Sequence, residues 1–154
     1  MKFLLLTILL FVTVAFYSCS VFFDSYVRNT TEETATIDVF LIETNQWVTL
    51  PNRVKIAHSL VNFKSGYKKY FSETTYVTWL NTKHFQLKVS AGSTIDLSDI
   101  AGKFLNSHPT KDVRVIVSTS TKSDTLLNGY RDFRSDLFQY NTIAFHPILY
   151  YDVK

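Results

Sequence analysis

Apolar side chains occur at every second position in three stretches of this chain. These stretches are residues 34–42 (TATIDVFLI), 85–89 (FQLKV) and 113–119 (VRVIVST). A period of two places alternate side chains on opposite sides of an extended backbone, so the pattern predicts strands with one buried face. Shorter runs rich in β-branched and aromatic residues predict further strands at residues 26–31, 47–50, 74–80 and 143–153.

Glycine, proline and polar residues separate these runs. Ser65 and Gly66 predict a hairpin turn in which Gly66 has a positive φ. Pro147 predicts a bend in the last strand, which would then be an edge or bulged strand. Residues 54–63 fit either a strand or a helix, and residues 122–135 are predicted to form a polar loop.

The order of these elements predicts an all-β fold. About eight to ten short strands, with a turn every 8–12 residues, are typical of a two-sheet antiparallel sandwich. Ser98 and Asp99 predict the start of one short helix over residues 100–105. The 13 Phe, 9 Tyr and 2 Trp residues supply core material for a single domain, which we place at residues 26–154.

The first residues have a different pattern. Lys2 is followed by fourteen uncharged residues (FLLLTILLFVTVAF), a Tyr-Ser pair and the only cysteine, Cys19. A charged start, a short apolar core and small residues before a cleavage site are typical of a secretory signal. We therefore assign residues 1–18 to a helical signal peptide and residues 19–25 to the mature N-terminus and a short tether.

At Cys19 the sequence resembles the signal of bacterial lipoproteins of the Bacteroidota type. The lipobox reads Phe16-Tyr17-Ser18-Cys19, in which Ser18 and Cys19 match and the first two residues depart from the usual Leu and Ala/Ser/Thr. The resemblance implies that Cys19 is acylated, with palmitate among its acyl chains, and becomes the mature N-terminus. The strand pattern is in turn similar to that of small immunoglobulin-like β-sandwich lipoproteins of unknown function.

Two other interpretations of the opening stretch stay open. Cys19 could be incidental to a plain signal peptide. Alternatively, residues 3–23 form a run of 21 residues without a charge, which is long enough for an uncleaved single-pass membrane anchor. All three interpretations export the domain. In lipoproteins of this type, acidic residues soon after the cysteine direct surface display, and only Asp24 lies nearby, so we expect the protein to face the periplasm.

The net charge of the chain indicates which classes of partner to expect. The chain has 16 Lys and Arg residues and 13 Asp and Glu residues, and Lys2 leaves with the signal, so the exported part carries a net charge of +2. Such a balance argues against the basic footprint of a nucleic-acid-binding domain. The expected partners are the membrane, through the lipid anchor, and an envelope protein or glycan.

No residue pattern selects a catalytic or metal site. The chain has no G-x-S-x-G motif, and its histidines lie more than 20 residues apart, at His58, His84, His108 and His146. All four glutamates lie in or beside predicted turns, so none is selected as one of the paired carboxylates of a glycosidase. We therefore expect no enzyme activity, no metal and no cofactor.

Cations and aromatic residues alternate in residues 63–71 (FKSGYKKYF). At a hairpin tip they could contact anionic lipid headgroups, peptidoglycan or an acidic partner. The alternative is an ordinary exposed hairpin whose lysines protect a sheet edge. Trp47 and Trp79 lie within strand patterns, which favours core positions over sugar-stacking platforms. The candidate binding residues are Lys64, Tyr67, Lys68, Lys69 and Tyr70.

Together these observations predict a non-enzymatic, lipid-anchored interaction or structural module of the cell envelope. One alternative is an envelope hydrolase with a site built from dispersed residues, which requires a cleft that gathers at least two histidines or carboxylates. Another is a soluble exported ligand carrier, which requires an apolar cavity between the sheets.

Overall fold

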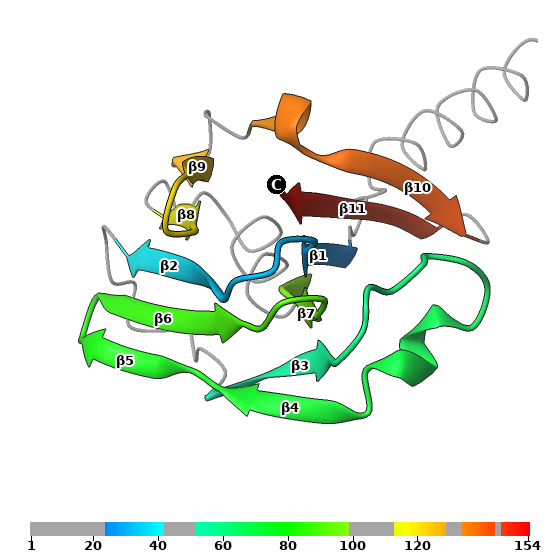
Figure 1. The fold of residues 1–154 in the computed structure, drawn as a ribbon, viewed down its shortest axis with the longest axis horizontal. Helices are drawn as coiled ribbons and strands as arrows, with labels where there is room; N and C mark the ends of the chain where they lie inside the picture. Colours follow the sequence, from blue (N-terminus) through cyan, green and yellow to red (C-terminus); the bar gives the residue numbers. More distant parts are fainter. Residues whose placement is uncertain (1–23, 42–51, 99–112, 129–133, 144–145) are drawn as a thin grey trace, which may run out of the picture.

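A computed structural model of the chain describes two packed β-sheets and the segments that join them (Figure 1). The described residues are 24–41, 52–98, 113–128, 134–143 and 146–154. They contain eleven strands and two short 3-10 helices, so the prediction of an all-β, two-sheet sandwich is confirmed. The strand predicted at residues 47–50 and the helix predicted at residues 100–105 lie outside the described residues.

The first sheet, sheet A, contains six strands in the order β10-β11-β1-β7-β3-β4. Its pairs are antiparallel except that β1 runs parallel to β11 over six residue pairs. The strands are β1 (Asp24–Asn29), β3 (Arg53–Ala57), β4 (Glu73–Tyr76), β7 (Thr94–Asp96), β10 (Gln139–Ile143) and β11 (His146–Val153).

The second sheet, sheet B, contains five antiparallel strands in the order β5-β6-β2-β8-β9. The three stretches with the most regular alternation form β6, β2 and β8, which lie side by side in its middle. The strands are β2 (Ala35–Leu41), β5 (Thr78–Asn81), β6 (His84–Val89), β8 (Val113–Ser118) and β9 (Ser123–Asn128).

The structure corrects three details of the sequence analysis. Residues 122–135 were expected to form a loop, but they contain β9 and the 3-10 helix η2 (Ser135–Leu137). A bulge in the pairing of β9 with β8 allows the consecutive residues Leu126 and Leu127 both to be buried, which hides the alternation. Residues 74–80 are not one strand, because β4 ends at Tyr76 and the chain continues in the other sheet as β5.

The third correction concerns the last strand. Pro147 was expected to make it an edge or bulged strand, yet β11 lies inside sheet A, between β10 and β1. Pro147 is only the second residue of β11, and the pairing with β1 begins one residue later, at Ile148. The missing backbone N–H therefore falls before the contact with β1, where a proline is tolerated.

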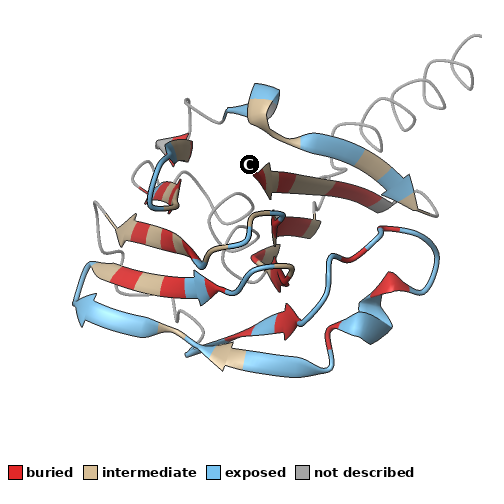
Figure 2. Cartoon of the chain, in the orientation of Figure 1, coloured by how far each residue is buried: buried red, intermediate tan, exposed pale blue. Residues whose placement is uncertain are grey.

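The main core lies between the sheets and is mostly aliphatic. Ile37, Val39 and Leu87 from sheet B pack against Val27 and Ile95 from sheet A, all of them at most 1 % exposed. Burial follows the predicted alternation closely in β2, β6 and β8 (Figure 2). Hydrophobic burial between the sheets is therefore the interaction that holds the sandwich together.

A second core covers the opposite face of sheet A, which we call its outer face. Residues 58–72, here called the covering segment, cross this face and include the 3-10 helix η1 (Tyr67–Tyr70). The segment buries Val61, Phe63, Tyr67 and Phe71 against Tyr26. No described helix is long and apolar enough to cross a membrane.

Candidate functional site

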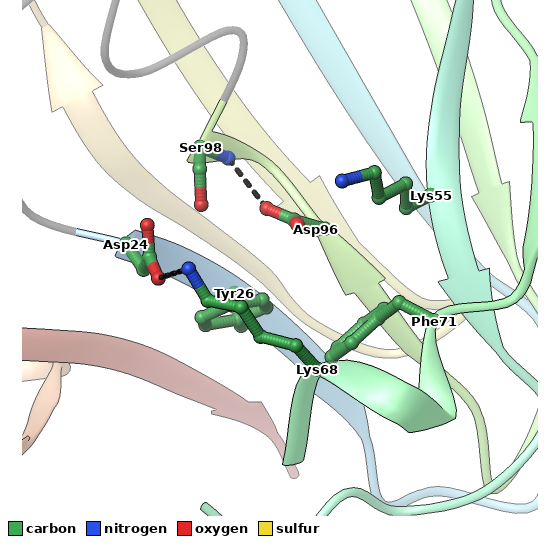
Figure 3. Close-up of a pocket in the computed structure, with 7 residues that line it drawn as sticks. All are labelled: Asp24, Tyr26, Lys55, Lys68, Phe71, Asp96 and Ser98. Carbon is green, nitrogen blue, oxygen red and sulfur yellow. Dashed lines mark hydrogen bonds and ion pairs between the residues drawn. The ribbon is translucent and has the colours of Figure 1, made fainter. Parts of the chain in front are cut away.

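A polar pocket opens where the covering segment ends on the outer face of sheet A. It has a volume of about 220 Å³. Asp24 and Tyr26 of β1, Asp96 of β7 and Lys55 of β3 face it from neighbouring strands (Figure 3). Lys68, Phe71 and Ser98 complete the lining. We call this hollow the Asp96 pocket.

The strand register explains why these side chains meet. Tyr26 is paired with Asp96, and Ile56 is paired with Ile95 in the neighbouring antiparallel pair, which places Lys55 next to Asp96. Because side chains alternate along a strand, Tyr26, Asp96 and Lys55 all point to the outer face while Ile95 and Ile56 point to the main core. The sheet thus presents a carboxylate and an ammonium group side by side.

Asp24 stands at the wall of the pocket that carries η1. The Tyr67 hydroxyl donates a hydrogen bond of 2.7 Å to Asp24 Oδ2, and Lys68 Nζ lies 3.1 Å from the same oxygen. The Tyr26 hydroxyl donates in turn to the Tyr67 hydroxyl at 3.2 Å. Burial raises the pKa of both tyrosines well above the usual value, so both hydroxyls stay protonated and serve as donors.

Asp96, the second carboxylate of the pocket, is strongly desolvated. The backbone N–H of Ser98 donates to its Oδ1 at 2.9 Å. Burial and the nearby charge of Asp24 raise the pKa of Asp96 above the usual value, while hydrogen bonds from the Ser98 side chain and backbone and the charge of Lys55 act in the opposite direction. Among the residues that the structure describes, no cation lies within 4.0 Å of its oxygens. An uncharged donor that enters the pocket would therefore not have to displace a paired cation from Asp96.

The predicted binding residues divide between this pocket and the solvent. The expected hairpin is instead the 3-10 helix η1, although Gly66 does have the predicted positive φ, at 79°. Tyr67 is buried in the second core and cannot form part of an exposed surface. Lys68 lines the pocket but is also exposed, as are Lys64, Lys69 and Tyr70, and Lys69 Nζ lies 5.3 Å from the centre of the Tyr70 ring. Cys19 lies outside the described residues.

One predicted core aromatic is exposed instead. Trp79 lies on the edge strand β5 with 40 % of its surface exposed, and its ring is 5.0 Å from that of the buried Phe85. Figure 2 shows that β4 and β5, one edge strand of each sheet, are largely exposed. Tyr76 of β4 is 64 % exposed, and the Arg53 guanidinium lies 4.2 Å from its ring centre. Trp47 lies outside the described residues.

The two histidines whose side chains the structure describes, His58 and His84, do not converge on a site. His58 contacts Glu73 at 3.2 Å, and His84 contacts Asp38 at 2.7 Å on the other sheet. His108 lies outside the described residues. No group of three or more His, Cys, Asp or Glu side chains among the described residues could hold a metal ion.

Sequence reasoning missed Asp24, Lys55 and Asp96 as a group. They are far apart in the chain and meet only through the register of β1, β7 and β3. The one available signal was that charged residues occupy the outward positions of short strand patterns, as in Thr94-Ile95-Asp96. Comparisons with protein-family models, curated proteins and solved structures gave no match, so the site is argued from its own geometry.

Proposed function

We propose that the protein is a cell-envelope lipoprotein that works as a non-enzymatic interaction module, held at the periplasmic face of a membrane through Cys19. The observation that supports this proposal is the position of β1, which begins at Asp24, two residues earlier than expected. Only four residues lie between Cys19 and Asp24, and the five residue-to-residue steps that join them span at most about 18 Å. The domain would therefore sit close to the lipid.

The same geometry orients the domain. β1 is an interior strand of sheet A, so the anchor would be joined directly to the folded core and not to a loose end. Lys68 contacts Asp24, and η1 with its exposed Lys69 consequently lies beside the point where the tether enters. The Asp96 pocket opens at this end as well. A module held in this way would meet its partner at or near the membrane surface.

Metabolic labelling with a palmitate analogue, followed by intact mass measurement, tests the attachment. We expect the wild-type protein to carry label and to require detergent for extraction. Cys19→Ala should lose the label and be extracted without detergent, because Cys19 is the residue that would carry the lipid. Ser20→Ala is the matched control and should keep both the label and the membrane fraction.

Two results would contradict the proposal in different ways. A wild-type protein that is unlabelled and soluble without detergent would indicate a plain signal peptide. An unlabelled protein that stays in the membrane with the mass of the full chain would indicate an uncleaved anchor over residues 3–23.

One observation favours the hydrolase as a second candidate. Asp24 and Asp96 both line the pocket, which meets the requirement for a cleft that gathers two carboxylates. Asp24, however, already accepts a hydrogen bond from Tyr67 and contacts Lys68. A screen of chromogenic glycosides tests this candidate, which requires that Asp24→Asn and Asp96→Asn each abolish turnover. The described pocket lies on the outer face of sheet A, so it is not the inter-sheet cavity that a ligand carrier requires.

A further inference from the structure

We infer that the Asp96 pocket and the neighbouring Tyr76 ring form a two-part site for a neutral saccharide chain. One sugar unit would occupy the pocket and the next would stack on Tyr76. This inference names a partner class for the proposed interaction module and rests on that proposal for its setting at the membrane.

The charges of the pocket favour an uncharged ligand rich in hydroxyl groups. Asp24 contacts Lys68, and Lys55 lies near Asp96 without forming an ion pair, so the two carboxylates and two ammonium groups of the lining carry no net formal charge. A ligand with a net charge would leave one of these groups uncompensated in a partly buried site, which is costly. A sugar hydroxyl donates to a carboxylate and accepts from an ammonium group at the same time. Such a hydroxyl can bridge Asp96 and Lys55 without displacing a charge.

The size and walls of the pocket fit one sugar ring. Its 220 Å³ is about the volume of seven water molecules in the liquid, which is below the range typical of drug-sized ligands. Phe71, which is 9 % exposed, provides a small apolar surface beside the four charged groups, whereas Tyr26 is only 1 % exposed. Apolar surface beside polar groups matches a sugar ring, in which C–H groups lie between hydroxyls.

Tyr76 extends the site along the same face. Lys55 is paired with Thr74, and Arg53 is paired with Tyr76, on the adjacent strands β3 and β4. Positions two apart on a strand share a face and lie about 7 Å from each other, so Tyr76 lies on the outer face beside the pocket. Arg53 packs against one face of the Tyr76 ring and holds it in place. With 64 % of its surface exposed, the Tyr76 side chain can receive a second sugar ring.

The test measures binding of sugars to the full chain by isothermal titration calorimetry. The protein is kept in an amine-oxide detergent, because sugar-based detergents would compete. The probes are N-acetylglucosamine and its hexamer, and glucose and maltohexaose. We expect at least one hexamer to bind about tenfold more tightly than its monosaccharide, since only the hexamer reaches both parts of the site.

Three variants separate the two parts of the site. Asp96→Ala should weaken binding of the monosaccharide and the hexamer alike, by about tenfold or more. Tyr76→Ala should weaken the hexamer about tenfold and leave the monosaccharide unchanged. Trp79→Ala, an exposed aromatic on the other sheet, is the matched control and should change neither. Circular dichroism of each variant verifies that it is folded.

A parallel measurement distinguishes the source of the sugar. Phosphatidylcholine vesicles with and without digalactosyldiacylglycerol replace the free probes in a flotation assay. Binding only to the glycolipid vesicles, with the same sensitivity to Asp96→Ala and Tyr76→Ala, would assign the ligand to glycolipid headgroups. Binding to free hexamers would assign it to a glycan chain.

The inference is overturned if no probe binds in either format, or if Trp79→Ala weakens the hexamer as much as Tyr76→Ala does. Neither result would affect the palmitate labelling, so failure of the sugar site and failure of the lipid attachment are separate outcomes.

Discussion

Sheet A packs a core on each of its two faces, but in different ways. Its inner face meets sheet B through aliphatic residues such as Val27 and Ile95, which belong to regular strands on both sides of the core. Its outer face is covered by the irregular segment 58–72, and the contacts there are largely aromatic. The Tyr26 ring, for example, lies 4.7 Å from that of Phe63 and 5.2 Å from that of Phe71.

The difference lies in where polar groups are tolerated. The covering segment is held to the sheet by specific hydrogen bonds, including Asn141 Nδ2 to the Phe63 carbonyl at 2.7 Å and the Val61 N–H to Thr94 Oγ1 at 3.0 Å. Because this cover is local and incomplete, it leaves a polar pocket at its margin. The inner face gives the domain its stability, and the outer face carries the pocket at which we propose a binding site.

The largest expected changes in stability come from removing one aromatic ring from the main core and one from the second core. Phe85→Ala, in the main core, should lower the free energy of unfolding by about 3–5 kcal/mol in urea titrations. Phe63→Ala should cost less, because the covering segment can detach while the sandwich stays folded. Amide hydrogen exchange checks this: Phe63→Ala should expose the amides of residues 58–72 and leave β2, β6 and β8 protected. Equal loss of protection in both regions would show that the two cores unfold as one.

The next effect concerns the ion pair that joins β1 to β11 on the outer face. Arg28 donates from Nε and Nη2 to the two carboxylate oxygens of Asp152, at 2.6 and 2.7 Å, and from Nη1 to the Val61 carbonyl at 3.2 Å. Arg28→Lys keeps the charge but loses the two parallel hydrogen bonds to Asp152. We therefore expect the free energy of unfolding in the urea titration to fall by about 2 kcal/mol.

An exposed pair offers a matched control for Arg28. Arg134 donates to Asp136 with the same two nitrogens, at 2.8 and 2.6 Å, but in solvent. Arg134→Lys should leave the urea midpoint unchanged, because exposed pairs contribute little. If Arg28→Lys also left the urea midpoint unchanged, the Arg28–Asp152 pair would not help to hold the covering segment.

A smaller effect is expected at the edge of the main core. The Tyr151 hydroxyl of sheet A donates to Asp124 of sheet B, and this bond, together with Lys122, lowers the pKa of Asp124. The bond therefore stabilises the fold above the ordinary aspartate pKa and is lost as the pH falls through the lower, folded-state pKa. We expect Asp124→Asn to cost about 1 kcal/mol at neutral pH and progressively less in acid. Tyr151→Phe should reproduce the loss; a cost independent of pH would contradict it.

The two faces also differ in how far they could be predicted. The strands β2, β6 and β8 follow from the alternation of residues 34–42, 85–89 and 113–119, because each has one face in the main core. The covering segment carries no comparable signal. Its buried residues are spaced by two and then by four positions, which matches neither a strand nor a continuous helix. The residues concerned are Val61, Phe63, Tyr67 and Phe71.

The pocket was beyond sequence reasoning for a different reason. Asp24 and Asp96 lie 72 residues apart, and they are brought together through a pairing of β1 with β7 that covers only three residue pairs. A strand as short as β7 has too few positions to show alternation. The lysines and aromatic residues of 63–71 did mark the right neighbourhood, since Lys68 and Phe71 line the pocket. The sequence could not show that Tyr67 turns inward.

The smallest expected change in the free energy of unfolding comes from Asp96→Asn, and its sign is opposite to that of Asp124→Asn. The sign shows whether the Asp96 carboxylate stabilises the fold. Burial raises the pKa of Asp96, so ionisation of this group lowers the free energy of unfolding. That reduction is absent below the ordinary aspartate pKa, where the carboxyl is protonated in both states. It grows as the pH rises toward the folded-state pKa and persists above it. Asp96→Asn removes the charge and can still accept from the Ser98 N–H.

We therefore expect Asp96→Asn to raise the free energy of unfolding by about 0.5–1 kcal/mol at neutral pH and to leave it unchanged in acid. Urea titrations at the two pH values measure the difference, with Asp124→Asn as the comparison of opposite sign. A carboxylate that weakens the fold at neutral pH serves something other than stability, and a ligand is the simplest candidate. If Asp96→Asn instead lowers stability as Asp124→Asn does, the Asp96 carboxylate is a structural group. Its hydrogen-bond donors are then protein groups and not sugar hydroxyls.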